Sequence, residues 1–391
     1  MENNEKRFVY ADNAATTAPH PDVVAEINKY MQDGWGNPSS LYGKGREAKR
    51  AVSEARERIA SHIGCAADEL FFTSCGSESD NWAIKGSLAV LGKGRNQIIT
   101  SAFEHPAVMN TCKSLQKQGF GVTFAGINPD GIVNVDEIKS AISNSTAITA
   151  IMMANNEIGT IQPIAEVAEI AHSHGSLVFT DAVQAVGSVT VNVGELGVDM
   201  LAMSGHKLHA PKGIGALYVK RGTKISPLID GGGQESRRRG GTENVPYIMG
   251  FAKALDIAHE RMADNAHLAS MRDKLMTELS KIPHSKVNGH PTMRLPGNLN
   301  IGFEYIEGES MLLFLDMEGI CVSTGSACSS NSLEPSHVLL AIGVPHEKSH
   351  GSLRISLCHD NTDADVDYII EKLPPIVEKL RSMSPIYPGN S

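Results

Sequence analysis

Short apolar runs alternate with longer segments in which apolar residues recur at helical spacing. Ala48, Val52 and Ile59, for example, fall on one face of a predicted helix, and Gly64 then provides a stop signal. The predicted strands of this part are 70–73, 97–100, 122–125, 147–153, 176–180, 200–203 and 216–219, and the predicted helices are 21–32, 46–63, 80 onward, 106–118, 135–142 and 163–174. Strands that alternate with helices predict an α/β fold with a largely parallel sheet covered on both faces.

The pattern changes after residue 248. Residues 248–280 have the apolar spacing of one long helix, which could bridge two domains. Beyond it the predicted strands are 299–303, 320–323 and 353–357, and the predicted helices are 310–317, 335–342 and 363–383. These elements predict a smaller C-terminal α/β domain, and we place Cys321 and Cys358 in its strands.

Composition and charge restrict the function. The chain has 391 residues, of which 20% are charged, and a formal net charge of −9. No broad basic face is expected, which argues against binding to nucleic acid or to an anionic membrane. The N-terminus lacks the apolar stretch of a signal peptide, and no window approaches a membrane span. We therefore expect a cytoplasmic protein, in which most of the six cysteines should be free thiols. No two of them show C-x-x-C spacing, which argues against a zinc ribbon or a thioredoxin-like site.

The stretch around Lys207 carries the first chemical signal. An apolar run, 200–203, is followed by Ser204, Gly205 and His206, and then by this lysine. Desolvation after a buried strand disfavours an ammonium, and it makes the neutral amine available as a Schiff-base nucleophile. A surface lysine in a glycine-rich loop explains this stretch equally well.

Asp181 favours the interpretation of Lys207 as a Schiff-base nucleophile. It ends the apolar strand 176–180 and precedes Lys207 by 26 residues, which is enough for one crossover and one further strand. A lysine and an acid at neighbouring strand ends suit pyridoxal 5′-phosphate, because the carboxylate can keep the pyridinium nitrogen protonated.

Other polar clusters end predicted strands. The turn that contains Gly76 and Ser77 joins a strand to a helix and could cradle a phosphate, although an ordinary capped helix start explains it as well. Glu104–His105 and Asn155–Glu157 end two further strands, and we expect these clusters to converge at one edge of the sheet.

These residues stand in motifs that run through nearly the whole chain. The motifs are GNPSSLYG, FTSCGSESDN, EHPAV, ANNEIGT, TDAVQAVG, SGHKLHAPKGIGALYVKRGT, RRRGGTEN, FEYIEGES, STGSACSSNSLEPSHVL and HGSLRISL. In this the sequence resembles cysteine desulfurases of the NifS/IscS type, which are class-V aminotransferase-like, fold-type-I pyridoxal-phosphate enzymes. The resemblance implies a large domain, 16–260, with a seven-stranded sheet. It also implies a small domain, 1–15 with 261–391, that carries a catalytic cysteine loop.

The resemblance implies a role for each matching residue. The implied cofactor contacts are Lys207, Asp181, Gln184, Asn156, Gly76, Ser77, Ser204, His206 and, across a homodimer interface, Thr242. Lys207 would bind the cofactor covalently, Asp181 would pair with the pyridinium nitrogen, and His105 would stack over the ring and transfer protons. Arg354 would clamp the substrate carboxylate, with Asn156 close by.

Cys328 is the implied sulfur-accepting nucleophile. Its neighbours in 323–331 are small and polar, which predicts an exposed loop rather than a packed core position. The resemblance implies conversion of L-cysteine to L-alanine, with sulfur passing through a Cys328 persulfide to an iron–sulfur scaffold or another acceptor protein. No resident metal is expected, and whether Cys328 transiently ligates a cluster is left open.

Two alternatives remain at this point. A related pyridoxal enzyme, such as an aminotransferase or a selenocysteine lyase, would share Lys207 and Asp181. A catalytically weak partner protein that binds an assembly scaffold is the other alternative, and the intact site residues argue against it. The sequence also departs from the family pattern once, because Cys358–His359 stand where Gly-Arg is usual.

Overall fold

A seven-stranded sheet forms the centre of the computed structural model, which describes residues 7–91, 93–324 and 335–388. The strand order is β2-β8-β7-β6-β5-β3-β4, and only β8 runs antiparallel to its neighbours. The strands are β2 (Leu70–Thr73), β3 (Gln97–Ser101), β4 (Gly121–Ala125), β5 (Thr146–Ala150), β6 (Leu177–Asp181), β7 (Met200–Ser204) and β8 (Gly215–Val219). The predicted mostly parallel seven-stranded sheet is therefore confirmed.

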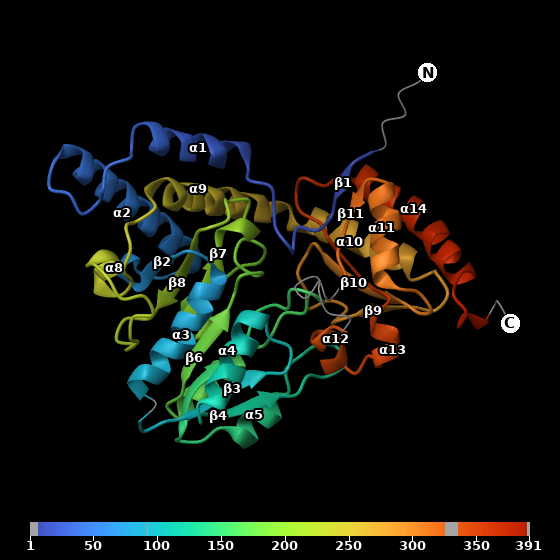
Figure 1. Cartoon of the computed structure of the whole chain (residues 1–391), viewed down its shortest axis with the longest axis horizontal. Helices are drawn as coiled ribbons and strands as arrows, with labels where there is room; N and C mark the ends of the chain where they lie inside the picture. Colours follow the sequence, from blue (N-terminus) through green and yellow to red (C-terminus); the bar gives the residue numbers. More distant parts are fainter. Residues whose placement is uncertain (1–6, 92, 325–334, 389–391) are drawn as a thin grey trace.

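Helices cover both faces of this sheet (Figure 1). Phe71 and Met200 face the core beneath α3 (Gly76–Leu91) and α4 (Pro106–Lys117). Phe72 and Leu201, one residue further along each strand, face the opposite core. That core also contains residues of α1 (Pro21–Gln32), α2 (Gly43–Ile63) and α9 (Val245–Arg261). Side chains of neighbouring strand residues thus enter different cores, as the pleat of a two-sided sheet requires.

A second core lies in the C-terminal part of the chain. Three antiparallel strands, β9 (Ser285–Asn288), β10 (Asn298–Phe303) and β12 (Ser352–Ser356), pack with α10 (Asn265–Leu279), α11 (Gly308–Met317) and α14 (Asp363–Ser382). Val9 and Ala11 belong to the same core, because β1 (Val9–Tyr10) pairs with β11 (Ile320–Cys321). This arrangement supports grouping the N-terminal residues with the C-terminal part, while the exact domain boundaries stay a prediction.

Short helices complete the description. They are α5 (Val135–Ala141), α6 (Ile164–Ser173), α7 (Val193–Leu196), α8 (Gln234–Arg237), α12 (His337–Ala341) and α13 (His346–Ser349). Among the described residues, none of these or the longer helices has the length and apolar content that a membrane crossing requires.

The predicted single helix over 248–280 is wrong. Helix α9 ends at Arg261, a 3₁₀ turn spans Met262–Asp264, and α10 begins at Asn265. Asp264 and Asn265 favour such breaks, because their short polar side chains compete for backbone groups. The side chain of Asn265 here donates to the carbonyl of Ser188. The placement of Cys358 in a strand is also wrong, since β12 already ends at Ser356.

Candidate active site

A cavity of about 370 Å³ lies at the C-terminal ends of β6 and β7. Ten predicted site residues line it: Gly76, Ser77, His105, Asn156, Asp181, Gln184, Ser204, His206, Lys207 and Arg354. The expected convergence at one sheet edge is thus confirmed for positions that lie far apart in the sequence. Ala14, Ala15, Cys75, Asp80, Met152 and Val183 also line the cavity.

Lys207 ends the short turn Gly205–Lys207 that follows β7. Its Nζ donates to the carbonyl oxygens of Ala14 and Ala15, each at 2.6 Å. The N-terminal segment therefore fixes the amine at the cavity wall. Among the described residues that line the cavity, Lys207 is the only lysine.

Asp181 is buried at the end of β6, and its Oδ1 accepts from the backbone N–H of Val183 at 2.9 Å. Burial raises the pKa of this carboxyl, while the nearby His105 acts in the opposite direction. A cationic partner would restore the ionised form by charge pairing. A pyridinium nitrogen is such a partner.

His105 caps the N-terminus of α4, where its Nδ1 accepts from the backbone N–H of Ala107 at 3.2 Å. Burial lowers the pKa of His105, and Lys207 lowers it further. The imidazole is therefore neutral near pH 7, with its proton assigned to Nε2 by the contact at Nδ1.

The predicted phosphate cradle lies at the start of α3. A Cβ on Gly76 would come within 2.8 Å of Val183 Cγ2, so the backbone approaches its neighbour more closely than other residues allow. Ser204 Oγ is buried and has no hydrogen-bond partner among the described residues. An unsatisfied hydroxyl near a helix N-terminus suits an anion such as a phosphate group.

Arg354 reaches the cavity from β12 and is 2% exposed. Its Nη2 donates to Asp12 Oδ1 at 2.8 Å, and its Nη1 donates to the carbonyl of Asn156 at 3.0 Å. The Nε atom is buried without a partner among the described residues. The two hydrogen bonds thus fix the orientation of the guanidinium and leave its Nε–H as a donor without a described partner.

Two predicted residues are not among the described residues that line this cavity. Thr242 is exposed in the loop after α8 and does not line it. Cys328 lies outside the described residues. Two described residues near it in the sequence make contacts beside the cavity, since Ser323 pairs with Arg354 through backbone hydrogen bonds and Ser336 donates to Glu157.

Sequence reasoning missed two acidic residues at the site. Asp80 is buried in α3, and its Oδ1 has no partner in the described part of the chain. Burial raises its pKa well above the usual value, and Asp181 adds to that effect. Asp12, which orients Arg354, was also missed. The only sequence signals for these two residues were the position of Asp80 within the motif FTSCGSESDN and that of Asp12 directly after Tyr10–Ala11.

Comparison with known proteins identifies the family. The model of the aminotransferase class-V family matches residues 9–369. The cysteine desulfurase IscS of Methanosarcina thermophila is 52% identical over 388 residues, which cover 99% of this chain and 96% of that protein. A cysteine desulfurase of Nostoc sp. is 50% identical over 380 residues, covering 96% and 94%. The chain belongs to the cysteine desulfurase family of class-V aminotransferases.

Solved structures agree with this assignment. A NifS-like protein superposes with a TM-score of 0.91 at 38% identity, covering 96% of this chain and 100% of that one. The structure titled "SspA in complex with cysteine" has a TM-score of 0.80 at 34% identity, covering 89% and 98%. The fold-type-I prediction is thereby confirmed.

The family depends on pyridoxal 5′-phosphate, and the residues of the cavity fit this cofactor. Lys207 offers an amine, Asp181 a buried carboxylate, and Ser204 a buried hydroxyl in need of a partner. When bound, the cofactor supplies an electron sink for negative charge at the substrate Cα.

Proposed function

We propose that this enzyme converts L-cysteine to L-alanine and transfers the sulfur to Cys328 as a persulfide. The supporting observation is that Lys207, Asp181 and Arg354 line one cavity in a chain about half identical to cysteine desulfurases. An amine, a buried acid and an oriented guanidinium are the groups that an amino-acid substrate requires there.

Binding and orientation fall to Arg354. Its charge would pair with the substrate carboxylate, and its fixed orientation reduces the entropy lost on binding. Asn156 lies beside it and would contact the same end of the substrate. Asp12 is a positioning residue in this proposal, because it acts only through the guanidinium.

Proton transfer falls to Lys207 and His105. The Lys207 amine would remove the Cα proton, and its position beside Ala14 and Ala15 keeps it at the cavity wall. The neutral His105 imidazole could donate the Nε2 proton to a leaving group. Asp181 would remain ionised against a cationic ring nitrogen.

Cys328 would carry out the sulfur transfer. Its thiolate attacks the substrate sulfur, an S–S bond forms, and the substrate Cβ–S bond breaks. The electron pair of that bond remains on the carbon skeleton, which takes up a proton and leaves as alanine. One thiol of the enzyme has become a persulfide, so sulfur and electrons balance without an external oxidant. The attachment of Ser323 and Ser336 beside the cavity supports this reach.

Incubation of the purified holoenzyme with L-cysteine alone tests this function. We expect alanine and a protein-bound persulfide in the absence of any keto acid. Alanine formation that requires a keto acid would instead identify an aminotransferase. No product, despite bound cofactor, would favour the weak scaffold-binding partner.

The onward acceptor is proposed on chemical grounds. A protein persulfide needs a second thiol or a scaffold cysteine to receive its terminal sulfur, so we propose an iron–sulfur assembly scaffold or another sulfur-acceptor protein as partner. We also propose a cytoplasmic location, because a reducing compartment keeps the Cys328 thiol available for each cycle.

The enzyme is proposed to be a homodimer in which Thr242 contacts the phosphate bound by the partner. Trp35, Leu41 and Tyr42 support an interface, since they are 66%, 89% and 61% exposed in one short segment. We expect sedimentation of a dimer at micromolar concentration, and a shift toward monomer in Leu41→Glu. Ile386→Glu, at another exposed apolar residue, is the control. A fully active wild-type monomer would contradict the proposal.

A further inference from the structure

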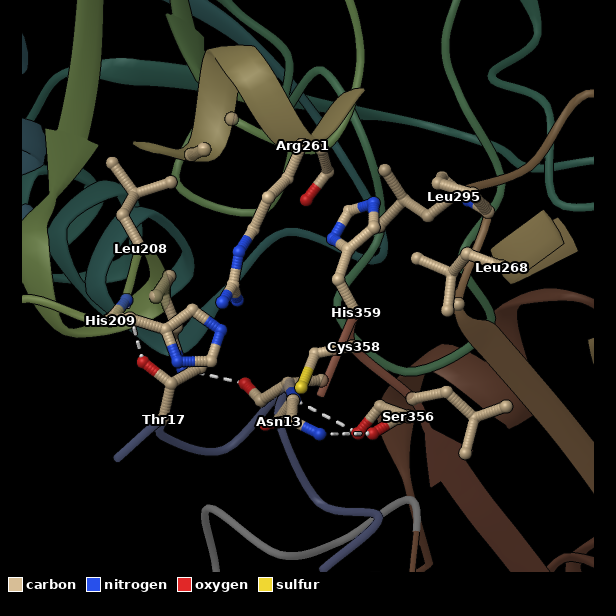
Figure 2. Close-up of a pocket in the computed structure, with 18 of the residues that line it drawn as sticks. Asn13, Thr17, Leu208, His209, Arg261, Leu268, Leu295, Ser356, Cys358 and His359 are labelled. Atoms are coloured by element: carbon tan, nitrogen blue, oxygen red, sulfur yellow. Dashed lines mark hydrogen bonds between the residues drawn. The ribbon is translucent and has the colours of Figure 1, made fainter. Parts of the chain in front are cut away.

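A second cavity, of about 90 Å³, lies next to the active site and shares Ala14, Gln184 and Lys207 with it. Figure 2 shows the rings of His209 and His359 and the sulfur of Cys358 around this space. These side chains have no part in the function proposed above. Cys358 and His359 are also the residues at which the sequence departs from the family pattern.

Three potential metal ligands converge here. His209, Cys358 and Asp360 each offer one ligand atom, and these atoms lie within 4.8 Å of one another. The loop that carries two of them is held by Asn361, whose Oδ1 accepts from the backbone N–H of Cys358 at 2.8 Å and whose Nδ2 donates to Tyr10. The relative positions of the thiol and the carboxylate are therefore preset.

The third ligand, His209, is positioned by contacts outside the loop that carries Cys358 and Asp360. The backbone of His209 is in the left-handed region, at φ 58°, and its N–H donates to Thr17 Oγ1 at 2.8 Å. One ring nitrogen, Nδ1, lies 2.9 Å from the carbonyl oxygen of Ala18. Histidine ligands of metals commonly make such a contact, which orients the ring.

Arg261 forms an ion pair with Asp360. Its Nη1 lies 2.9 Å from Asp360 Oδ1, while Oδ2 faces His209 at 3.9 Å from Nδ1. The guanidinium thus contacts one carboxylate oxygen, while the other lies on the side of His209. Its positive charge opposes a bound cation, but an ionised thiolate and carboxylate together outweigh it.

We propose that His209, Cys358 and Asp360 bind a borderline divalent cation such as Zn²⁺. Imidazole nitrogen, thiolate sulfur and carboxylate oxygen are the ligands that zinc takes in proteins. Three protein ligands leave a fourth coordination position open. The cation replaces the thiol proton, which passes to solvent. None of the three ligands has a role in the desulfurase chemistry proposed above.

Zinc content and the zinc X-ray absorption spectrum test this site in the holoenzyme. The full-length protein is freed of metal with a chelator, incubated with excess Zn²⁺ and passed through a desalting column. We expect wild type to retain one zinc per chain, with one sulfur at about 2.3 Å and nitrogen or oxygen at about 2.0–2.2 Å. Cys358→Ser and Asp360→Asn should each weaken zinc binding at least about tenfold.

Cys65→Ser is the matched control, because it removes another partly buried thiol that is not one of the three ligands. Bound cofactor, measured by visible absorption, reports whether each variant is folded. If Cys358→Ser does not fold, Asp360→Asn decides, since the Asp360 side chain is 55% exposed. Failure of wild type to retain zinc overturns the proposal. So does undiminished zinc, with the same sulfur signal, in Cys358→Ser or in Asp360→Asn.

Discussion

Lys207→Ala is expected to abolish both cysteine turnover and the visible absorption of bound cofactor. Lys207 is the only lysine among the described residues that line the cavity, and its amine is fixed by Ala14 and Ala15. No neighbouring amine can therefore replace it. Loss of a positioned proton-transfer group alone costs about 10²–10⁴-fold in kcat, or roughly 3–5 kcal/mol. Loss of the proposed covalent link to the cofactor would add to this.

Lys212→Ala provides a matched control on the same loop, because this lysine is exposed and does not line the cavity. It should retain activity and colour. Lys207→Arg should fail like Lys207→Ala, since a guanidinium does not give up its proton in proteins. Alanine production and cofactor absorption that both persist in Lys207→Ala would refute the central assignment.

The pairing of Asp181 with Lys207 could be predicted because residues that follow adjacent parallel strands lie close together in space. Asp181 ends β6 and Lys207 closes the turn that follows β7, and these two strands are parallel partners with Asp181 opposite Ala202. A buried parallel strand has a recognisable apolar sequence, and its C-terminal end in such folds is where ligands bind. Local pattern and a general rule of topology were therefore sufficient for these two residues.

Other parts of the site depend on contacts that no local pattern encodes. The partners of Lys207 are backbone carbonyls of Ala14 and Ala15, and any residue type has such carbonyls. Asp12 and Arg354 are 342 positions apart, so their ion pair depends on how the N-terminal strand joins the C-terminal part. The end of α9 was missed for a related reason. The apolar spacing continues past Arg261, and only the local polar chemistry of Asp264 breaks it.

The environments of the other cysteines bear on the sulfur-transfer step. Burial raises the pKa of the Cys65 and Cys112 thiols to about 12 and that of Cys358 to about 11. A protonated thiol is a poor nucleophile, so these residues are unsuited to attack a substrate sulfur near pH 7. Cys75 differs from them, because it lines the active-site cavity.

Cys328→Ala is expected to bind cofactor and cysteine normally and to form no alanine. Cys328 is not one of the predicted cofactor contacts, most of which line the cavity, so binding should persist. Sulfur transfer should stop, because the substrate sulfur loses its nucleophile. A fall of about 10³-fold or more, equivalent to about 4 kcal/mol, is expected for loss of a covalent catalyst. Alanine release and cofactor absorption, measured on the same sample, separate catalysis from binding.

Cys75→Ala is the decisive comparison, since Cys75 is the described thiol that lines the cavity. Each variant is incubated with isotopically labelled cysteine, and the persulfide is located by mass spectrometry of its peptides. Cys75→Ala should carry the label on Cys328 and release alanine, while Cys328→Ala should carry none. The opposite result would be a label on Cys75 and full alanine release in Cys328→Ala, together with no label in Cys75→Ala. That result would assign the nucleophile to Cys75, in the turn before helix α3. The attachment of Ser323 and Ser336 beside the cavity would then serve a purpose other than delivery of a thiol.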